Sequence, residues 1–372
     1  MTLADRLRDR IKRDGPITFH DWMQAALYDE TDGYYRRERI RQGRAGDYRT
    51  APETSPLFGA TLANYFARCY SQLGSPSDWT IFEIGAGRGD FAHTVLASLR
   101  QNFSEVFAAT HYLIDEIGDE TRNALALKLD EYSNRVQFRS LAEATPPVTG
   151  IVFSNELLDA FPVHRVIGRQ GALRELCVDI DEAREFVWRQ CDLEPQLRTY
   201  CEAIDLQLDE GQIFEVNLAA DDFVARAASL LDRGFLITVD YGAERTELLD
   251  DPHRFKGTLR SFLRHRMIDD VLAHPGEQDL TTTVDWTQLK TAGERHGLET
   301  KTLERLDRFL LNEGLPDQLS MLSAKLADTV ELFKLNAGAR EMIMPDGLAA
   351  HFQVLIQQKI SWSVAPARLT YS

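Results

Sequence analysis

Three glycines at alternate positions, Gly85, Gly87 and Gly89, stand between a short apolar run and a helical pattern. Such a turn lets the backbone approach a ligand without clashes from Cβ atoms, and the following helix offers free N–H groups at its N-terminus. Dinucleotide sites usually have the spacing Gly-x-Gly-x-x-Gly, which binds a pyrophosphate. The spacing here is shorter, and Glu83 adds a carboxylate two residues before the first glycine. This arrangement favours a ligand with an amino group over a pyrophosphate.

A second acidic residue, Glu116, closes the next apolar run along the chain. A carboxylate at the end of that strand can bind both hydroxyls of a ribose, whereas Asp115 alternates away from that side. An adenosyl group, an amino group and no phosphate together describe S-adenosylmethionine. We therefore predict this cofactor, with the following cofactor-binding residues: Glu83, Gly85, Gly87, Gly89, Glu116 and Asn155. The alternatives are a purely structural turn and, least favoured by the glycine spacing, a nucleotide-dependent dehydrogenase.

Polar residues follow the apolar run at residues 150–154, where a predicted strand ends. Ligands of open α/β sheets bind beyond the carboxyl ends of the strands, so these residues lie on the reactive side. Glu156 and Asp159 form a candidate catalytic pair, because two carboxylates can orient a planar guanidinium and offset its repulsion from a sulfonium. Methyl transfer is an in-line displacement that depends mainly on such positioning. The alternative is that Glu156 caps a helix and Asp159 is solvated.

Three tyrosines near the N-terminus, Tyr34, Tyr35 and Tyr48, are candidates for an aromatic lid over a cationic sulfonium. Aromatic residues at such spacing also pack hydrophobic cores, so a structural role stays open. Residues 36–48 are polar and rich in arginine, which is typical of a mobile loop.

Alternating strand and helix patterns from Trp79 onward must position these residues, and they predict an α/β fold with a Rossmann-like, largely parallel sheet. We expect a helical N-terminal extension at residues 1–76, beginning with an amphipathic helix after Thr2, and a core at residues 77–372. The core carries an antiparallel insertion at about 163–210 and a polar insertion at about 243–284. The apolar runs that predict its buried strands are residues 80–85, 110–116, 136–139, 150–155 and 235–240.

The overall charge of the 372-residue chain narrows the choice of partners. Acidic residues outnumber basic ones by 58 to 42, giving a formal charge of -16 that repels a phosphate backbone, so we expect no nucleic-acid partner. The four cysteines form no Cys-x-x-Cys pair, and we predict no metal. We also predict no membrane span, since no apolar stretch approaches the roughly 20 residues required, and a cytoplasmic location, since no export signal is evident.

Further motifs are spread along nearly the whole chain. In chain order they are residues 15–19 (GPITF), 26–28 (ALY), 33–35 (GYY), 46–48 (GDY), 50–53 (TAPE), 55–59 (SPLFG), 83–89 (EIGAGRG), 154–163 (SNELLDAFPV), 239–242 (VDYG), 257–259 (GTL), 265–266 (HR), 275–281 (PGEQDLT) and 284–286 (VDW). With this set the chain resembles the MidA-like methyltransferases, which include mitochondrial complex I assembly factors regarded as protein arginine methyltransferases. It departs from them at residues 117–118, where serine is usual, and at Thr283, where histidine is frequent.

The resemblance implies a class I methyltransferase sheet with S-adenosylmethionine as donor. In the mitochondrial members it implies an arginine of a respiratory-complex subunit as acceptor. We therefore expect an S-adenosylmethionine-dependent methyltransferase that modifies an arginine side chain of a protein substrate, with a respiratory-complex subunit as one candidate. The alternatives are a small-molecule methyltransferase and a non-catalytic, methyltransferase-like assembly factor.

Overall fold

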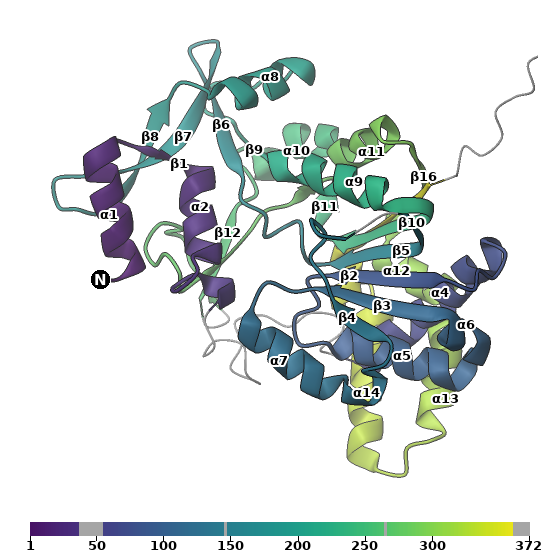
Figure 1. Cartoon of the computed structure of the whole chain (residues 1–372). Helices are drawn as coiled ribbons and strands as arrows, with labels where there is room; N and C mark the ends of the chain where they lie inside the picture. The colour runs from purple at the N-terminus through teal and green to yellow at the C-terminus, as the bar shows by residue number, and fades with distance from the viewer. Residues whose placement is uncertain (37–54, 145–146, 264–265, 360–372) are drawn as a thin grey trace, which may run out of the picture.

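The computed structural model describes residues 1–36, 55–144, 147–263 and 266–359. Within them, a seven-stranded sheet with helices on both faces adjoins a separate five-stranded sheet that carries the N-terminal helices (Figure 1). The polar segment predicted to form a loop at residues 36–48 lies outside the described residues, apart from Arg36. Tyr48 lies outside them as well.

The seven-stranded sheet confirms the predicted α/β fold. Its strands, in spatial order, are β16 (Leu298–Arg305), β17 (Gln353–Lys359), β10 (Leu231–Asp240), β5 (Val148–Asn155), β2 (Trp79–Ile84), β3 (Thr110–Asp115) and β4 (Val136–Phe138). The five strands from β10 to β4 are parallel, and β17 is antiparallel to both of its neighbours. The strand order reverses between β2 and β5: β3 and β4 follow on one side of β2, whereas β5 and β10 lie on its other side. A crevice beyond the carboxyl ends of these two strands is therefore the expected ligand site.

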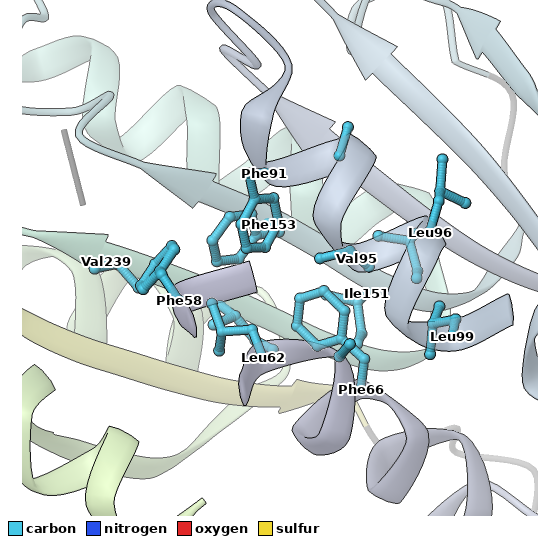
Figure 2. Packing of buried hydrophobic residues seen from close by; sticks show 14 of the residues in the cluster. Phe58, Leu62, Phe66, Phe91, Val95, Leu96, Leu99, Ile151, Phe153 and Val239 are labelled. Atoms are coloured by element: carbon cyan, nitrogen blue, oxygen red, sulfur yellow. The ribbon is translucent and has the colours of Figure 1, made fainter. Parts of the chain in front are cut away.

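Helices bury both faces of this sheet at its centre, which explains why β2, β5 and β10 are nearly continuous buried runs. One face is covered by α4 (Pro56–Gln72) and α5 (Asp90–Asn102), whose phenylalanines pack on β5 (Figure 2). The rings of Phe91 and Phe153 stack there with centroids 4.4 Å apart. Burying each such side chain contributes about 2–3 kcal/mol. The other face is covered by α9 (Leu218–Leu230) and α11 (Trp286–Arg295).

The remaining helices extend these two layers. Against the α4 face lie α12 (Leu306–Asn312), α13 (Leu315–Ser323) and α14 (Thr329–Ile343). The other short helices are α6 (Ser104–Ala109), α7 (Asp119–Lys128), α8 (Pro195–Ala203) and α10 (Arg245–Asp250), with 3-10 turns η1 (Tyr34–Arg36), η4 (Asp130–Tyr132), η5 (Pro252–Arg254) and η6 (Leu348–His351). No helix within the described part of the chain combines the length and the apolar character needed to cross a membrane.

The five-stranded sheet is antiparallel throughout. It contains β1 (Ile17–Thr18), β7 (Ala172–Ile180), β6 (His164–Arg169) and β9 (Ile213–Val216) in that order, with β8 (Phe186–Cys191) also paired to β7. Helices α1 (Leu3–Asp14) and α2 (Phe19–Tyr28) pack against it through a shared core. Thr2 accepts a hydrogen bond from the Asp5 backbone, so the predicted N-cap and amphipathic helix are confirmed.

The structure differs from the predicted domain organisation at three places. Within residues 1–76, α4 packs on the core sheet, because its buried face is apolar along its whole length. The strand at residues 213–216 lies beyond the predicted antiparallel insertion at about 163–210, yet it pairs with β6 and so prolongs that insertion. The polar insertion at 243–284 contains short strands that its polarity concealed: β11 (Gly242–Ala243), β12 (Arg260–Leu263), β13 (Arg266–Met267), β14 (Asp279–Thr281) and β15 (Val284–Asp285).

Candidate cofactor and acceptor site

A cavity of about 2160 Å³ lies at the carboxyl ends of β2, β3 and β5. Its walls come from the glycine turn, from the segment after β5, and from α2, η1, β12 and β14. The predicted site residues that line it are Glu83, Gly85, Gly87, Glu116, Asn155, Glu156 and Asp159. Gly89 does not line it, although its neighbours Arg88 and Asp90 do. The structure therefore brings all but one of the predicted site residues around a single space.

The three glycines of the turn adopt φ values of +75°, +52° and +73°, which side chains other than glycine rarely adopt. A Cβ added to Gly87 would meet no atom within 4 Å, so the backbone here faces open space. A Cβ on Gly89 would lie 2.3 Å from Cδ2 of Leu125 on α7. Gly89 also occupies the N-cap position of α5, where no side chain caps the helix. Its role is therefore to close the turn against α7, which differs from the predicted contact with the cofactor.

Glu116 and Asp115 point their carboxylates to different partners. Glu116 accepts a hydrogen bond at Oε2 from the Gly87 backbone (3.0 Å) and one at Oε1 from the Gly118 backbone (3.3 Å). Asp115 accepts at Oδ2 from the Leu141 backbone (2.7 Å). The Glu116 carboxylate is thus the one that lies beside the glycine turn, which supports its choice over Asp115 as the ribose ligand.

Glu83 is a buried carboxylate at the floor of the cavity, and the Tyr112 hydroxyl donates a hydrogen bond to its Oε2 (2.7 Å). Burial raises the pKa of Glu83 to about 7, the Tyr112 hydrogen bond opposes this effect, and the charge of Glu116 adds to it. A cationic ligand group nearby would favour the ionised form. The site is therefore suited to an ammonium group, as the sequence predicts.

The raised pKa of Glu83 predicts a pH-dependent stability. Between pH 4.5 and about 7 the folded protein retains a proton that the unfolded chain releases, so the free energy of unfolding falls by roughly 3 kcal/mol as the pH rises. We expect Glu83→Gln to remove this decline, since glutamine can still accept from Tyr112 and carries no charge. Urea unfolding at about pH 5 and pH 8 measures the effect. A decline as steep in Glu83→Gln as in the parent protein would contradict this assignment.

The turn that carries the predicted catalytic pair is held by β10. Glu156 adopts φ +50°, a strained value for a residue other than glycine, and its N–H donates to the Val239 carbonyl (2.9 Å). The buried Asp240 accepts at Oδ2 from the backbone N–H groups of residues 157–159, at 2.9 to 3.4 Å. Asp240 therefore positions the pair. Sequence reasoning gave it no role, although it ends a predicted core strand, the signal that selected Asn155.

Asp159 lies only 5% exposed beside Glu156, so the alternative of a solvated loop acid does not hold. No helix begins at Glu156 either, whose Oε1 instead accepts from Asn155 Nδ2 (3.1 Å). Burial raises the pKa of Asp159 well above its usual range, and three neighbouring carboxylates raise it further: Asp240, Glu156 and Asp279. The Arg260 guanidinium opposes them. This part of the cavity is therefore strongly acidic and poor in compensating cations.

Aromatic side chains from the N-terminal segment form one wall of the cavity. Tyr28 stacks on Tyr35 (centroids 5.5 Å apart), and Tyr34 meets Tyr35 edge-on (5.2 Å). Tyr34 is also buried in the core beneath the five-stranded sheet, so it both packs this core and lines the cavity. Tyr28, which sequence reasoning did not select, donates from its hydroxyl to the Ala160 carbonyl (2.9 Å). The wall is thereby tied to the turn after β5.

Comparison with known proteins decides which family this geometry represents. Residues 61–303 match the model of a family described as "Putative S-adenosyl-L-methionine-dependent methyltransferase". The chain belongs to this family. It is an S-adenosylmethionine-dependent methyltransferase, and the predicted family, cofactor and enzyme class are confirmed.

A solved structure supports the same conclusion for nearly the whole methyltransferase chain. A protein from Burkholderia thailandensis bound to S-adenosyl-homocysteine is 29% identical, with a TM-score of 0.84 over 96% of this chain and 92% of that one. Its bound molecule is the demethylated form of the predicted donor. No group of three or more histidine, cysteine or acidic side chains among the described residues of this methyltransferase is arranged to hold a metal ion.

Curated relatives carry an arginine methyltransferase name. The mitochondrial protein arginine methyltransferase NDUFAF7 of Xenopus tropicalis is 25% identical, over 98% of this chain and 88% of its own length. The human protein of that name is 25% identical over 92% and 80%, and the Drosophila melanogaster homolog is 27% identical over 80% and 71%. These relatives are named mitochondrial, which contradicts the prediction of a cytoplasmic location. The absence of an export signal, on which it depended, does not distinguish the two compartments.

Proposed function

We propose that this methyltransferase modifies an arginine side chain of a protein, and that Glu156 and Asp159 orient the acceptor guanidinium. The observation that carries the proposal is the acidic group beside the glycine turn, in which Asp240 accepts from the Asp159 N–H and the Val239 carbonyl accepts from the Glu156 N–H. Its relatives' names support an arginine acceptor. A respiratory-complex subunit as the substrate stays a prediction from the family resemblance.

The residues of the turn fit the donor. Gly85 and Gly87 would let the backbone approach it, Glu83 would bind its amino group and Glu116 its ribose hydroxyls. Asn155 has a buried Oδ1 without a hydrogen-bond partner among the described residues, so the site has polar capacity left for a ligand. When bound, S-adenosylmethionine supplies a methyl group on a cationic sulfonium.

The acceptor residues have three tasks in this proposal. Glu156 and Asp159 hold the planar guanidinium by charge-assisted hydrogen bonds, with one nitrogen directed at the methyl carbon. Their charge offsets the repulsion between two cationic groups. The guanidinium nitrogen that gains the methyl group loses a proton, and Asp159, whose pKa burial raises, is suited to accept it.

The cavity is large enough to hold an acceptor side chain together with the donor. Pockets for small ligands usually enclose roughly 300–1,000 Å³, and this one holds about 2160 Å³. It continues from the glycine turn to α2 and the three-stranded sheet of β12, β13 and β14. An acceptor side chain can therefore enter beside the donor.

Methyl transfer into cell extract tests the proposal. We expect the purified enzyme, given S-adenosylmethionine with a labelled methyl group, to label extract proteins, and acid hydrolysis to release the label as methylarginine. An extract without added enzyme gives the background. Label recovered only as methyllysine or only in small molecules would refute the arginine assignment, while leaving the methyltransferase identity intact.

A further inference from the structure

Asp279 belongs to the acceptor side of the cavity, although it comes from an insertion far from the glycine turn. It is the first residue of β14 and is 6% exposed. In the pairing with β12 it faces Phe262, and Thr281 faces Arg260. All four residues line the cavity, as the two-residue alternation of paired strands requires when one face of a small sheet forms a wall.

Asp279 is anchored close to the proposed catalytic pair. Just beyond β14, the Thr282 N–H donates to the Asp159 carbonyl (2.8 Å), so the segment that carries Asp279 is bonded to the turn after β5. Both Asp159 and Asp279 line the cavity, and the charge of Asp279 contributes to the raised pKa of Asp159. Asp279 thus faces the same space as Asp159.

The orientation of the Asp279 side chain comes from the N-terminal extension. The Tyr35 hydroxyl donates to Oδ1 of Asp279 (2.8 Å). Tyr35 in turn stacks on Tyr28, which is bonded to the Ala160 carbonyl. A carboxylate held through both a neighbouring hydroxyl and its own strand is pre-organised for a ligand, because little side-chain freedom is left to lose on binding.

The acids of this group outnumber the cation that faces them. Arg260 faces these acids and lies over the Tyr241 ring at 5.4 Å. Against it stand the carboxyl groups of Glu156, Asp159 and Asp279, with Asp240 behind the turn. A sulfonium and a guanidinium together bring two positive charges, which such an acidic space stabilises and which in turn favour the ionised carboxylates.

We infer that Asp279, positioned by Tyr35, is a third acceptor-binding carboxylate that selects a cationic guanidinium over a neutral side chain of the same shape. The inference rests on the proposed arginine acceptor. It assigns to the insertion and the N-terminal extension a direct part in acceptor specificity, whereas the donor depends on the core sheet.

Two small probes test this inference in the protein saturated with S-adenosyl-homocysteine. N-acetyl-arginine amide carries the guanidinium, and N-acetyl-citrulline amide is its neutral isostere. We expect the parent protein to bind the arginine probe more tightly, and Asp279→Asn to reduce that preference about ten-fold or more, since it removes a charge-assisted bond. Tyr35→Phe should reduce it several-fold. NMR titration measures the six affinities, two probes for each of three proteins, and calorimetry checks that donor affinity is unchanged.

Asp307→Asn is the matched control, because Asp307 on α12 is equally buried, pairs with Arg305 at the end of β16 and does not line the cavity. It should keep the full preference. A parent protein without preference for the arginine probe would refute the proposed acceptor itself. A parent preference that survives in Asp279→Asn would overturn only the role of Asp279. If Asp279→Asn also loses donor binding, Asp279→Glu is the deciding variant, because it keeps the negative charge. We expect Asp279→Glu to keep the preference for the arginine probe. Loss of that preference in Asp279→Glu would overturn the inference.

Discussion

Gly87→Val should weaken the binding of S-adenosylmethionine by about a hundred-fold or more and remove methyl transfer. Gly87 has φ +52°, and a β-branched residue in this left-handed region costs on the order of 1–2 kcal/mol. The larger effect is steric: a side chain at Gly87 extends into open space of the cavity, where we expect the cofactor to lie. Its N–H also donates to Glu116, so a shifted backbone displaces the proposed ribose ligand. Isothermal titration calorimetry with the cofactor measures the loss.

Gly74→Val separates the donor effect from general instability. Gly74 also has a positive φ, +82°, with no atom within 4 Å of an added Cβ, but it lies at the end of α4 and does not line the cavity. It should bind the donor as the parent protein does. If Gly87→Val gave the same heat of donor binding as the parent protein, the donor would have to lie elsewhere. Equal losses in both variants would mean that strained glycines affect stability alone.

Glu156→Gln should lower kcat/KM for protein methylation by about a hundred-fold or more and leave donor affinity within two-fold. The substitution keeps the shape of the side chain and its backbone φ, and it removes one negative charge beside the acceptor. Loss of a charge-assisted hydrogen bond that acts on a cationic acceptor is worth roughly 3 kcal/mol, which corresponds to that factor. Labelled methyl transfer into extract protein measures the rate, and calorimetry measures the donor affinity.

Glu131→Gln is the control for this substitution. Glu131 forms an exposed ion pair with Arg100 (2.7 Å) in the turn η4, and such surface pairs contribute little to stability. This variant should retain the parent rate. Near-normal labelling by Glu156→Gln would exclude a role for this carboxylate in orienting the acceptor, and Asp159 would then have to act without it.

Local sequence patterns predicted the strands of the core sheet, because a short apolar run is enough to indicate a buried strand. Five strands were predicted from short apolar runs, and a helical pattern was recognised after the glycine turn; the structure confirms the five strands and places α5 after that turn. Pairing across long separations leaves no such signal. The strand at residues 213–216 reads like a core strand, and only its contact with β6 shows otherwise. The strands β12 and β14 carry polar residues that line a cavity instead of a core, so their composition does not indicate buried strands.

For the same reason, only the part of the candidate site that lies on the core strands was predicted. Residues near the ends of core strands, such as Glu116 and Asn155, were found by the rule that ligands bind beyond those ends, and the structure brings them to one cavity. Asp240 satisfied that rule and was given no role; its carboxylate accepts from the backbone of residues 157–159, a contact that the sequence pattern does not indicate. Asp279 and Tyr28 reach the cavity from elements whose position depends on tertiary packing. Sequence spacing alone does not reveal such neighbours.

The pairing of β1 with β7 has a consequence for how the protein is made. Ile17 lies opposite Val178, so the first strand of the chain has no partner until the ribosome has added more than 160 further residues. Helices α1 and α2, whose apolar faces pack on that sheet, must wait equally long with those faces exposed. Residues 3–28 are therefore a stretch where chaperones should bind during synthesis.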